Sequence, residues 1–261
     1  MWHPGGEATA MDVVESIKSV VGRITGANRL TPRDLAAHLR RRKPQTTRFK
    51  DDGDIPNNPL PFCLYGGAVD LADSADPAAI FEQLFAANGW GDSWRNGIYT
   101  YVHYHSRIHE VLGIARGHAR VRFGGDRGRI VEVKAGDVAV LPAGTGHQCL
   151  GASDDFLVVG AYPPSGTYDE CRGSPAEHAQ ALQKIPNVAL PRKDPVYGNA
   201  GPLLRLWAPA KRSPKSATKP ATKSRSKARP KARAKARPTA RRARAAKRRS
   251  ATRKRAASPR G

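Results

Sequence analysis

The sequence predicts a mainly β protein in which two small antiparallel sheets form a barrel, with a few peripheral helices. Two observations favour this class. Short runs of β-type residues follow one another between glycine-containing turns in the middle of the chain. Their spacing is typical of antiparallel strands and not of strands that alternate with long helices. The C-terminal stretch, in contrast, has a composition that cannot bury a core and predicts disorder.

The positive charge of the chain is concentrated at its C-terminal end. The formal net charge is +23, from 45 Lys and Arg against 22 Asp and Glu. Residues 211–260 contain 22 of the basic residues and no acidic one, so residues 1–210 carry 23 basic and 22 acidic side chains. We therefore expect three parts: an N-terminal helical arm (residues 1–43), a barrel with its flanking segments (44–208) and a disordered tail (209–261).

The cysteines and the N-terminus favour a soluble cytoplasmic protein. The three cysteines are odd in number and share no short pair spacing, which argues against a disulfide framework or a thiolate zinc site. The first ten residues lack the basic and then apolar pattern of a secretory signal. The apolar run over residues 156–162 is too short to cross a bilayer, so no membrane span is expected.

The N-terminal arm contains two predicted helices. Apolar residues recur with a helical period over residues 11–26. Thr31 is a predicted N-cap with Pro32 at the first helical position, and this second helix should end before Pro44. We expect the two helices to pack on the barrel or across a dimer interface. A helix pair that reads DNA is the alternative.

The next segment should contain the first strand, a helix and a tryptophan-containing loop. The strand is predicted over residues 62–69, and the helix starts at Asp76 and Pro77 and stops at Asn88 and Gly89. The loop over residues 89–97 carries Trp90 and Trp94. Its tryptophans could close a pocket as a lid, but we expect them to pin the loop to the barrel.

Six β-type runs then make up the rest of the predicted barrel. They cover residues 98–105, 110–115, 119–123, 129–134, 138–141 and 156–161. Beyond them the chain is rich in Pro and Gly, with a helical patch near residues 176–185. A closing segment over residues 194–207 has Leu and Trp side chains that should cover the barrel.

Two histidines and a carboxylate are expected to meet on one face of the sheet. His103 and His105 alternate on a predicted strand, so their rings share a face with Tyr99 and Tyr101. Glu110 follows after a turn of four residues and begins the neighbouring predicted strand. An antiparallel partner can place its carboxylate against the two imidazoles.

A third histidine completes the predicted site. His147 follows a sharp turn over residues 142–146, which can aim its ring inward. If the register of the strand shifts by one residue, His109 would replace Glu110 as a ligand, but we favour Glu110. Imidazole and carboxylate donors without thiolate suit one divalent transition metal, namely iron, manganese, nickel, zinc or copper. They argue against a structural zinc site.

The spacing of these residues resembles that of the cupin superfamily. The first cupin motif is matched by Gly97-x5-His103-x-His105-x4-Glu110-x6-Gly117, and the second by Gly136-x5-Pro142-x-Gly144-x2-His147. Gly151 departs from the second motif, which usually has a structural Asn there. Further stretches are similar to the YjlB-like cupins: Ile55-Pro-Asn-Asn-Pro, Asn88-Gly-Trp-Gly and Asp194-Pro-Val-Tyr-Gly. The resemblance covers residues 44–208 and implies a jelly-roll barrel that pairs as a homodimer, without implying a reaction.

The proposed ligands leave one or two positions open on a five- or six-coordinate ion, which is typical of a catalytic site. Parity along the strands makes Tyr99, Tyr101 and Cys149 candidates for the lining of a pocket. The hypothesis is a metal-dependent oxygenase that acts on a small molecule. Lewis-acid isomerisation is a second possibility for the chemistry. A non-catalytic cupin that senses a small molecule or is only structural is the alternative.

The C-terminal tail is expected to bind nucleic acid without sequence specificity. Residues 211–261 resemble linker-histone tails and consist mainly of Lys, Arg, Ala, Ser, Thr and Pro, with no aromatic residue. Contacts with phosphates would make the affinity steeply dependent on salt, and the protein would then be nucleoid-associated. An acidic lipid surface or a nuclear-import receptor are the competing partners. In the non-catalytic alternative, association with DNA is the main role of the protein.

Overall fold

The structure is a computed structural model that describes residues 29–72 and 74–208. The predicted helix over residues 11–26 and the tail over residues 209–261 lie outside the described residues, so both stay predictions. Within the described residues, no helix is long and apolar enough to cross a membrane.

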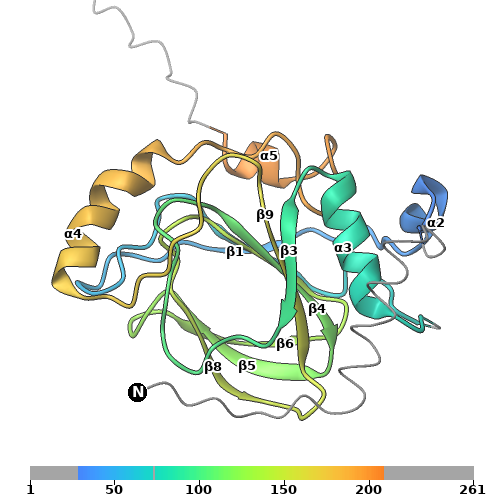
Figure 1. Ribbon diagram of the computed structural model, residues 1–261, viewed down its shortest axis with the longest axis horizontal. Helices are drawn as coiled ribbons and strands as arrows, with labels where there is room; N and C mark the ends of the chain where they lie inside the picture. The colour runs from blue at the N-terminus through green and yellow to red at the C-terminus, as the bar shows by residue number, and fades with distance from the viewer. Residues whose placement is uncertain (1–28, 73, 209–261) are drawn as a thin grey trace, which may run out of the picture. The chain divides into compact units, whose positions relative to one another are not determined.

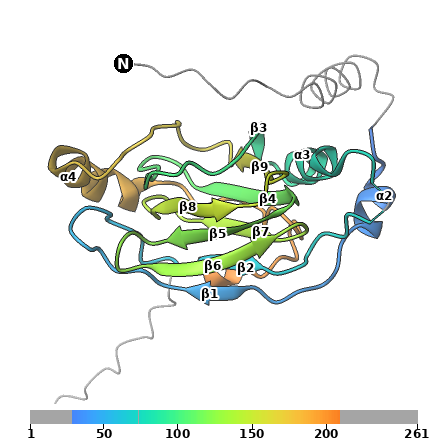
Figure 2. The same ribbon diagram turned by 90° about the horizontal axis from the view of Figure 1, so that it is seen from below.

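The described part of the chain forms two antiparallel sheets that face each other across the barrel (Figures 1 and 2). The larger sheet has the strand order β1-β2-β7-β4-β9-β3, and the smaller one the order β6-β5-β8. The strands are β1 (Gln45–Thr47), β2 (Phe62–Tyr65), β3 (Gly91–Asn96), β4 (Glu110–Arg116), β5 (His118–Phe123), β6 (Arg129–Lys134), β7 (Val138–Leu141), β8 (His147–Ala152) and β9 (Leu157–Tyr162). The predicted double-sheet barrel is confirmed.

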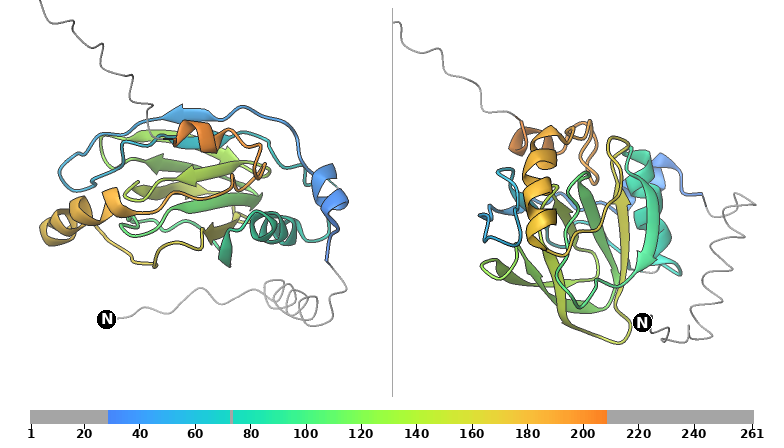
Figure 3. Two further views of the ribbon diagram at one scale, coloured as in Figure 1. Left: turned by 90° about the horizontal axis from the view of Figure 1, so that it is seen from above. Right: turned by 60° about the vertical axis from the view of Figure 1, so that its left-hand side comes forward.

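The central strands of the larger sheet are buried on both faces, and their alternating side chains contribute to two different cores. On β4, Leu112 and Ile114 pack inside the barrel with side chains of the smaller sheet. Val111 and Ala115 point the other way, into a second core that includes α3 (Pro77–Ala87). Figure 3 shows this helix lying along the outside of the sheet. Alternate positions of β4 therefore face either the barrel interior or the outer core.

The helix boundaries follow local capping signals. Thr31 and Asp34 form a capping box at the start of α2 (Pro32–Ala37), as the sequence predicts. This helix ends earlier than expected, because the chain beyond His38 pairs with an extended segment: Arg40 N donates to the Ala68 carbonyl oxygen at 2.9 Å. Helix α3 starts and ends at the predicted caps, Asp76 and Asn88.

The C-terminal part of the described chain contains short helices that pack around the barrel. They are α4 (Pro175–Lys184), the 3-10 helix η1 (Ile185–Asn187) and α5 (Leu203–Leu206). The expected cover is confirmed for Leu203 and Trp207, which are both buried in the outer core. The indole of Trp207 donates to the Pro61 carbonyl oxygen at 2.8 Å. Trp90 is pinned in the same way, by a 3.0 Å hydrogen bond to the Lys193 carbonyl oxygen.

The structure differs from the strand predictions at four places. Residues 98–105 form no regular strand and make only isolated bridges at His103 and Tyr104. The predicted loop before them contains β3, which pairs with β9 and lays the Trp94 ring over Gly160. Strand β8 was not predicted at all, and β2 stops at Tyr65, short of the expected end.

Candidate metal centre

His103 and His147 are held together by main-chain hydrogen bonds. The two residues form an isolated antiparallel bridge, in which His103 N donates to the His147 carbonyl oxygen at 3.2 Å and His147 N donates back at 2.9 Å. His147 is also the first residue of β8. This bridge brings the two rings to a centroid distance of 4.0 Å.

His105 is positioned by the turn of the second motif. Its carbonyl oxygen accepts a 2.7 Å hydrogen bond from the amide of Gly144. Gly144 has a φ of +88°, and a Cβ there would lie 2.6 Å from the Asn57 carbonyl oxygen, so only glycine fits this turn without strain. The turn that precedes His147 therefore also fixes the backbone of His105.

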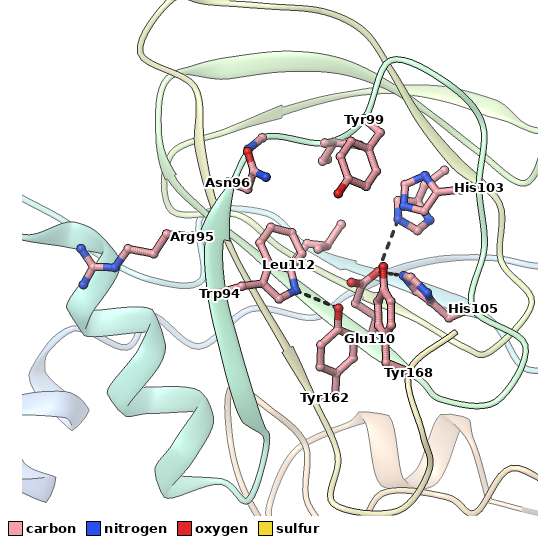
Figure 4. Close-up of a pocket in the computed structure, with 13 residues that line it drawn as sticks. Trp94, Arg95, Asn96, Tyr99, His103, His105, Glu110, Leu112, Tyr162 and Tyr168 are labelled. Atoms are coloured by element: carbon pink, nitrogen blue, oxygen red, sulfur yellow. Dashed lines mark hydrogen bonds and ion pairs between the residues drawn. The ribbon is translucent and has the colours of Figure 1, made fainter. Parts of the chain in front are cut away.

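The three histidines converge on one point, as Figure 4 shows for His103 and His105. One ring nitrogen from each of His103, His105 and His147 lies within 4.8 Å of the others, and all three side chains are buried. This spacing could hold a metal ion. Three imidazoles on one side of an ion are a common arrangement in transition-metal sites.

The second nitrogen of each ring fixes the tautomer that a metal requires. Each Nδ1 atom faces a main-chain carbonyl oxygen. Nδ1 of His103 lies 3.5 Å from that of Tyr101, Nδ1 of His147 lies 3.3 Å from that of Thr145, and Nδ1 of His105 faces that of Asp169. A carbonyl oxygen can only accept, so each Nδ1 carries the proton in these contacts. In the neutral ring this leaves the Nε2 lone pair free for an ion.

Glu110 faces the same point as the histidines. It begins β4 on the barrel-side face with Leu112, and its side chain is 2% exposed. Its Oε2 lies 3.4 Å from Nε2 of both His105 and His147. This oxygen has no hydrogen-bond partner within the described residues. A buried carboxylate oxygen without a hydrogen bond is costly unless a cation balances it, so the donor set fits a divalent metal.

His109 points away from the histidine cluster. Its Nδ1 accepts a 2.9 Å hydrogen bond from the Ala143 amide, and its ring packs 4.7 Å from that of Trp207. Burial lowers the pKa of His109 to about 4. The structure therefore places Glu110, and not His109, beside the proposed ligands. The predicted register is the one observed.

The buried charges of the cluster shift one another's pKa values. Burial disfavours the charged form of His105, but the neighbouring Glu110 carboxylate outweighs this and raises the pKa of His105 to about 8. The histidines in turn lower the pKa of Glu110 to about 2, against the opposing effect of burial. Burial and the adjacent His103 lower the pKa of His147 to about 3. At neutral pH the metal-free cluster thus holds one carboxylate and one proton, which is mainly on His105.

A cavity of about 340 Å³ opens beside the four side chains. Its other lining residues are Trp94, Arg95, Asn96, Gly97, Ile98, Tyr99, Leu112, Tyr162 and Tyr168. Figure 4 shows the Trp94 indole, which donates a 2.8 Å hydrogen bond to the Tyr162 hydroxyl. Burial, followed by the charge of Glu170, raises the pKa of Tyr168 to about 12.

Only one of the predicted pocket residues lines this cavity. Tyr99 does so, whereas Tyr101 is not among the lining residues: its ring stacks on that of Tyr99 at a centroid distance of 4.8 Å, and its hydroxyl donates to Glu170 at 3.2 Å. Cys149 packs within the barrel core. Parity failed for Tyr101 because its segment is not a regular strand, so alternate side chains do not share a face.

Two lining residues, Tyr162 and Tyr168, are not among the residues predicted from the sequence. Tyr162 could have been found, because it shares a face of β9 with Val158, a residue of the barrel interior. Tyr168 lies in an irregular segment whose sequence gives no periodic signal. Its ring centroid is 4.9 Å from that of His105.

Comparison with known proteins identifies the family. No family model matches the chain. The chain is 42% identical over 167 residues to YjlB of Bacillus subtilis, an uncharacterized protein, and the match covers 64% of this chain and 98% of YjlB. The chain belongs to the YjlB family. The double-sheet barrel and the two motifs make this YjlB-family protein a cupin.

The similarity to solved structures is low. Acireductone dioxygenase from Bacillus anthracis, with a cadmium ion in its active centre, is 22% identical with a TM-score of 0.25, over 35% of this chain and 64% of that one. Oxalate decarboxylase of Bacillus subtilis, a protein with Mn(II) centres, is 19% identical with a TM-score of 0.26, over 46% and 30%. A double-stranded β-helix protein from Klebsiella pneumoniae is 14% identical with a TM-score of 0.27, over 57% and 95%.

Proposed function

We propose that this YjlB-family cupin binds one divalent transition metal ion and acts as a mononuclear oxygenase on a small molecule. The ligands are His103, His105, Glu110 and His147. The observation that carries the proposal is the convergence of one ring nitrogen from each histidine beside Glu110, whose buried Oε2 lies 3.4 Å from Nε2 of His105 and His147 and has no hydrogen bond within the described residues. Iron, manganese, nickel and zinc all accept this donor set.

The four side chains supply the donors on one side of the ion and leave the cavity side for a substrate. When bound, the ion would provide the open positions at which a substrate oxygen and dioxygen are activated. Leu112, Ile98 and the Trp94 indole form an apolar wall of the cavity, which limits the access of water to the site. The three Nδ1 contacts hold the imidazoles in place, so that an ion needs little rearrangement of the rings.

Metal analysis of the purified full-length protein tests this proposal. We expect about one equivalent of metal in the wild type, and a loss of at least tenfold in occupancy for His103→Ala. His118→Ala is the matched control because His118 is exposed on β5. Equal metal content in the wild type and in His103→Ala would refute the site. A full site without dioxygen uptake or product formation would favour a non-catalytic sensor instead.

The C-terminal composition supports a second proposed function, which is non-specific association with nucleic acid. The 22 basic residues of the segment 211–260 have no acidic neighbours in sequence, so their charge is available for phosphates. We expect full-length protein to bind DNA with an affinity that falls steeply between 50 and 200 mM salt, on the order of tenfold or more. Equal DNA retention by a chain truncated after residue 208 would refute this role and the nucleoid location.

The oligomeric state is a further proposal. Cupin barrels commonly pair edge to edge, and we propose that this protein is a homodimer. Sedimentation of the full-length protein is expected to give a dimer. A single monomeric species at micromolar concentration would contradict it.

A further inference from the structure

We infer that the cavity beside the proposed metal centre takes a catechol-type ligand, that is, an aromatic ring with two adjacent oxygen donors. The same cavity should discriminate against dicarboxylates and phosphorylated compounds. This inference rests on the proposed function, because the ion would hold the two oxygens. It is carried by the charges and the aromatic side chains of the residues around the four proposed ligands.

The cavity offers no free cation to an anionic group. Among its described lining residues, Arg95 is the only Arg or Lys. Its guanidinium is turned away from the histidines in Figure 4 and is held by two acids on or beside α3. It donates to the Asp76 carboxylate at 3.0 and 3.1 Å and to the Glu82 carboxylate at 3.0 Å twice. A carboxylate or phosphate in the cavity would find no unpaired guanidinium there.

The two arginines just outside the cavity, Arg107 and Arg172, already have polar partners. Arg172 donates to Glu170 at 2.9 Å and lies over the Tyr101 ring, 4.0 Å from its centroid. Arg107 lies 4.0 Å from the Asp169 carboxylate and hydrogen-bonds to nearby main-chain carbonyl oxygens. Neither side chain lines the cavity. Both are therefore unsuited to binding the far end of a dianionic substrate.

The charge balance of the centre favours a ligand with one negative charge. Three neutral imidazoles and one carboxylate around a divalent ion leave a net charge of +1. A singly deprotonated catechol neutralises this charge. A dicarboxylate would leave an excess negative charge in a buried site, where none of the described lining residues offers a free cation to compensate it.

The remaining walls suit an aromatic ring. Tyr99 is 43% exposed and Tyr168 is 49% exposed, so both lie at the open side of the cavity. Their ring centroids are 5.2 Å from that of His103 and 4.9 Å from that of His105. A planar ligand whose oxygens point at the ion can therefore stack against one of these tyrosine rings at the open side of the cavity. The volume, about 340 Å³, limits the ligand to one or two rings.

The test uses full-length protein loaded with Zn(II), which has no redox chemistry, and 4-nitrocatechol, whose visible spectrum changes on metal coordination. Oxalate and inorganic phosphate serve as competitors. We expect 4-nitrocatechol to bind at least tenfold more tightly than oxalate. The zinc content is measured in the same samples. Zinc at full occupancy with oxalate bound as tightly as 4-nitrocatechol would overturn the inference and leave the metal centre intact, whereas absence of zinc would overturn the proposed function itself.

Two sets of variants report on the residues responsible. Tyr168→Ala should weaken 4-nitrocatechol binding about threefold to tenfold, whereas Tyr168→Phe retains the ring and should bind nearly as the wild type does. Asn96→Arg places a free cation at an exposed lining position and should tighten oxalate binding at least tenfold. Unchanged nitrocatechol affinity in Tyr168→Ala together with unchanged oxalate affinity in Asn96→Arg would overturn this account of ligand selection.

Discussion

Replacing Glu110 by Gln should change which nitrogen atoms carry protons in the metal-free centre. The substitution keeps the shape of the side chain and removes a buried negative charge that lies 3.4 Å from His105 Nε2. In the wild type this charge raises the pKa of His105 from its ordinary value of 6.5 to about 8. That difference corresponds to about 2 kcal/mol of stabilisation of the protonated ring. Without the charge, burial is opposed mainly by the weaker effects of the Asp169 carbonyl and carboxylate, so the pKa of His105 should fall toward 6.5 or below.

The sign of the effect on stability follows from the raised pKa. His105 stabilises the metal-free fold by about 2 kcal/mol below pH 6.5, where it is protonated in both states, and this contribution disappears as the pH rises through about 8. Glu110→Gln should remove this dependence on pH between 6.5 and 8. In the wild type at pH 7, metal binding must also displace about one proton from His105. The Glu110→Gln variant should release much less than one proton when the metal binds.

Proton-detected NMR titration of the histidine rings in metal-free protein measures the pKa directly. Calorimetry in buffers of different ionisation enthalpy measures the protons released when zinc binds. Glu132→Gln is the control, because Glu132 is exposed on β6. If the pKa of His105 stays near 8 in Glu110→Gln, the charge that holds its proton is not that of Glu110, and the electrostatic reasoning is wrong.

Three further substitutions test the fold around the site. Gly113→Ala should destabilise the protein by about 1–3 kcal/mol in denaturant unfolding, because the new Cβ would lie 2.4 Å from a ring carbon of Phe81; an unchanged midpoint would contradict this packing. Gly144→Ala should reduce both stability, by about 1–2 kcal/mol, and zinc affinity, because φ is +88° there; an effect on neither would refute the role of the turn. Asp169→Ala removes hydrogen bonds to Ser106 N at 2.8 Å and Ser106 Oγ at 2.5 Å, and should weaken zinc binding about tenfold with all four ligands present. Wild-type zinc affinity in that variant would show that the segment does not position the site.

The side chains of the proposed centre could be predicted because their spacing also specifies the turns that bring them together. Gly144 is required by the turn geometry, and that turn holds both His105 and His147 in place. Glu110 follows the His105 turn at the first position of β4, where the alternation of the strand directs it into the barrel. These are local constraints, and a sequence pattern can express local constraints.

The cavity walls could not be predicted in the same way, because they depend on long-range pairing. The sequence of strand β3, Gly-Asp-Ser-Trp-Arg-Asn, contains no β-branched residue. It forms a strand because β9 offers it hydrogen bonds and Gly160 leaves space for the Trp94 ring. Residues 98–105 have the composition of a strand, but they pair only at isolated bridges. Tyr168 reaches the cavity from an irregular segment, for which no periodicity exists.

The hydrogen bond from His105 to the Asp169 carbonyl oxygen determines when, during synthesis, the chain can bind a metal ion in its final geometry. The acceptor lies 64 residues later in the chain than the ring that it holds, and Tyr104 pairs with Cys171 beside it. During synthesis His103 and His105 leave the ribosome well before the segment around Asp169, which holds the ring of His105. Metal capture in the final geometry must wait for that segment. A nascent chain arrested before Asp169 should therefore bind zinc weakly, and zinc retention becomes a readout of completed folding.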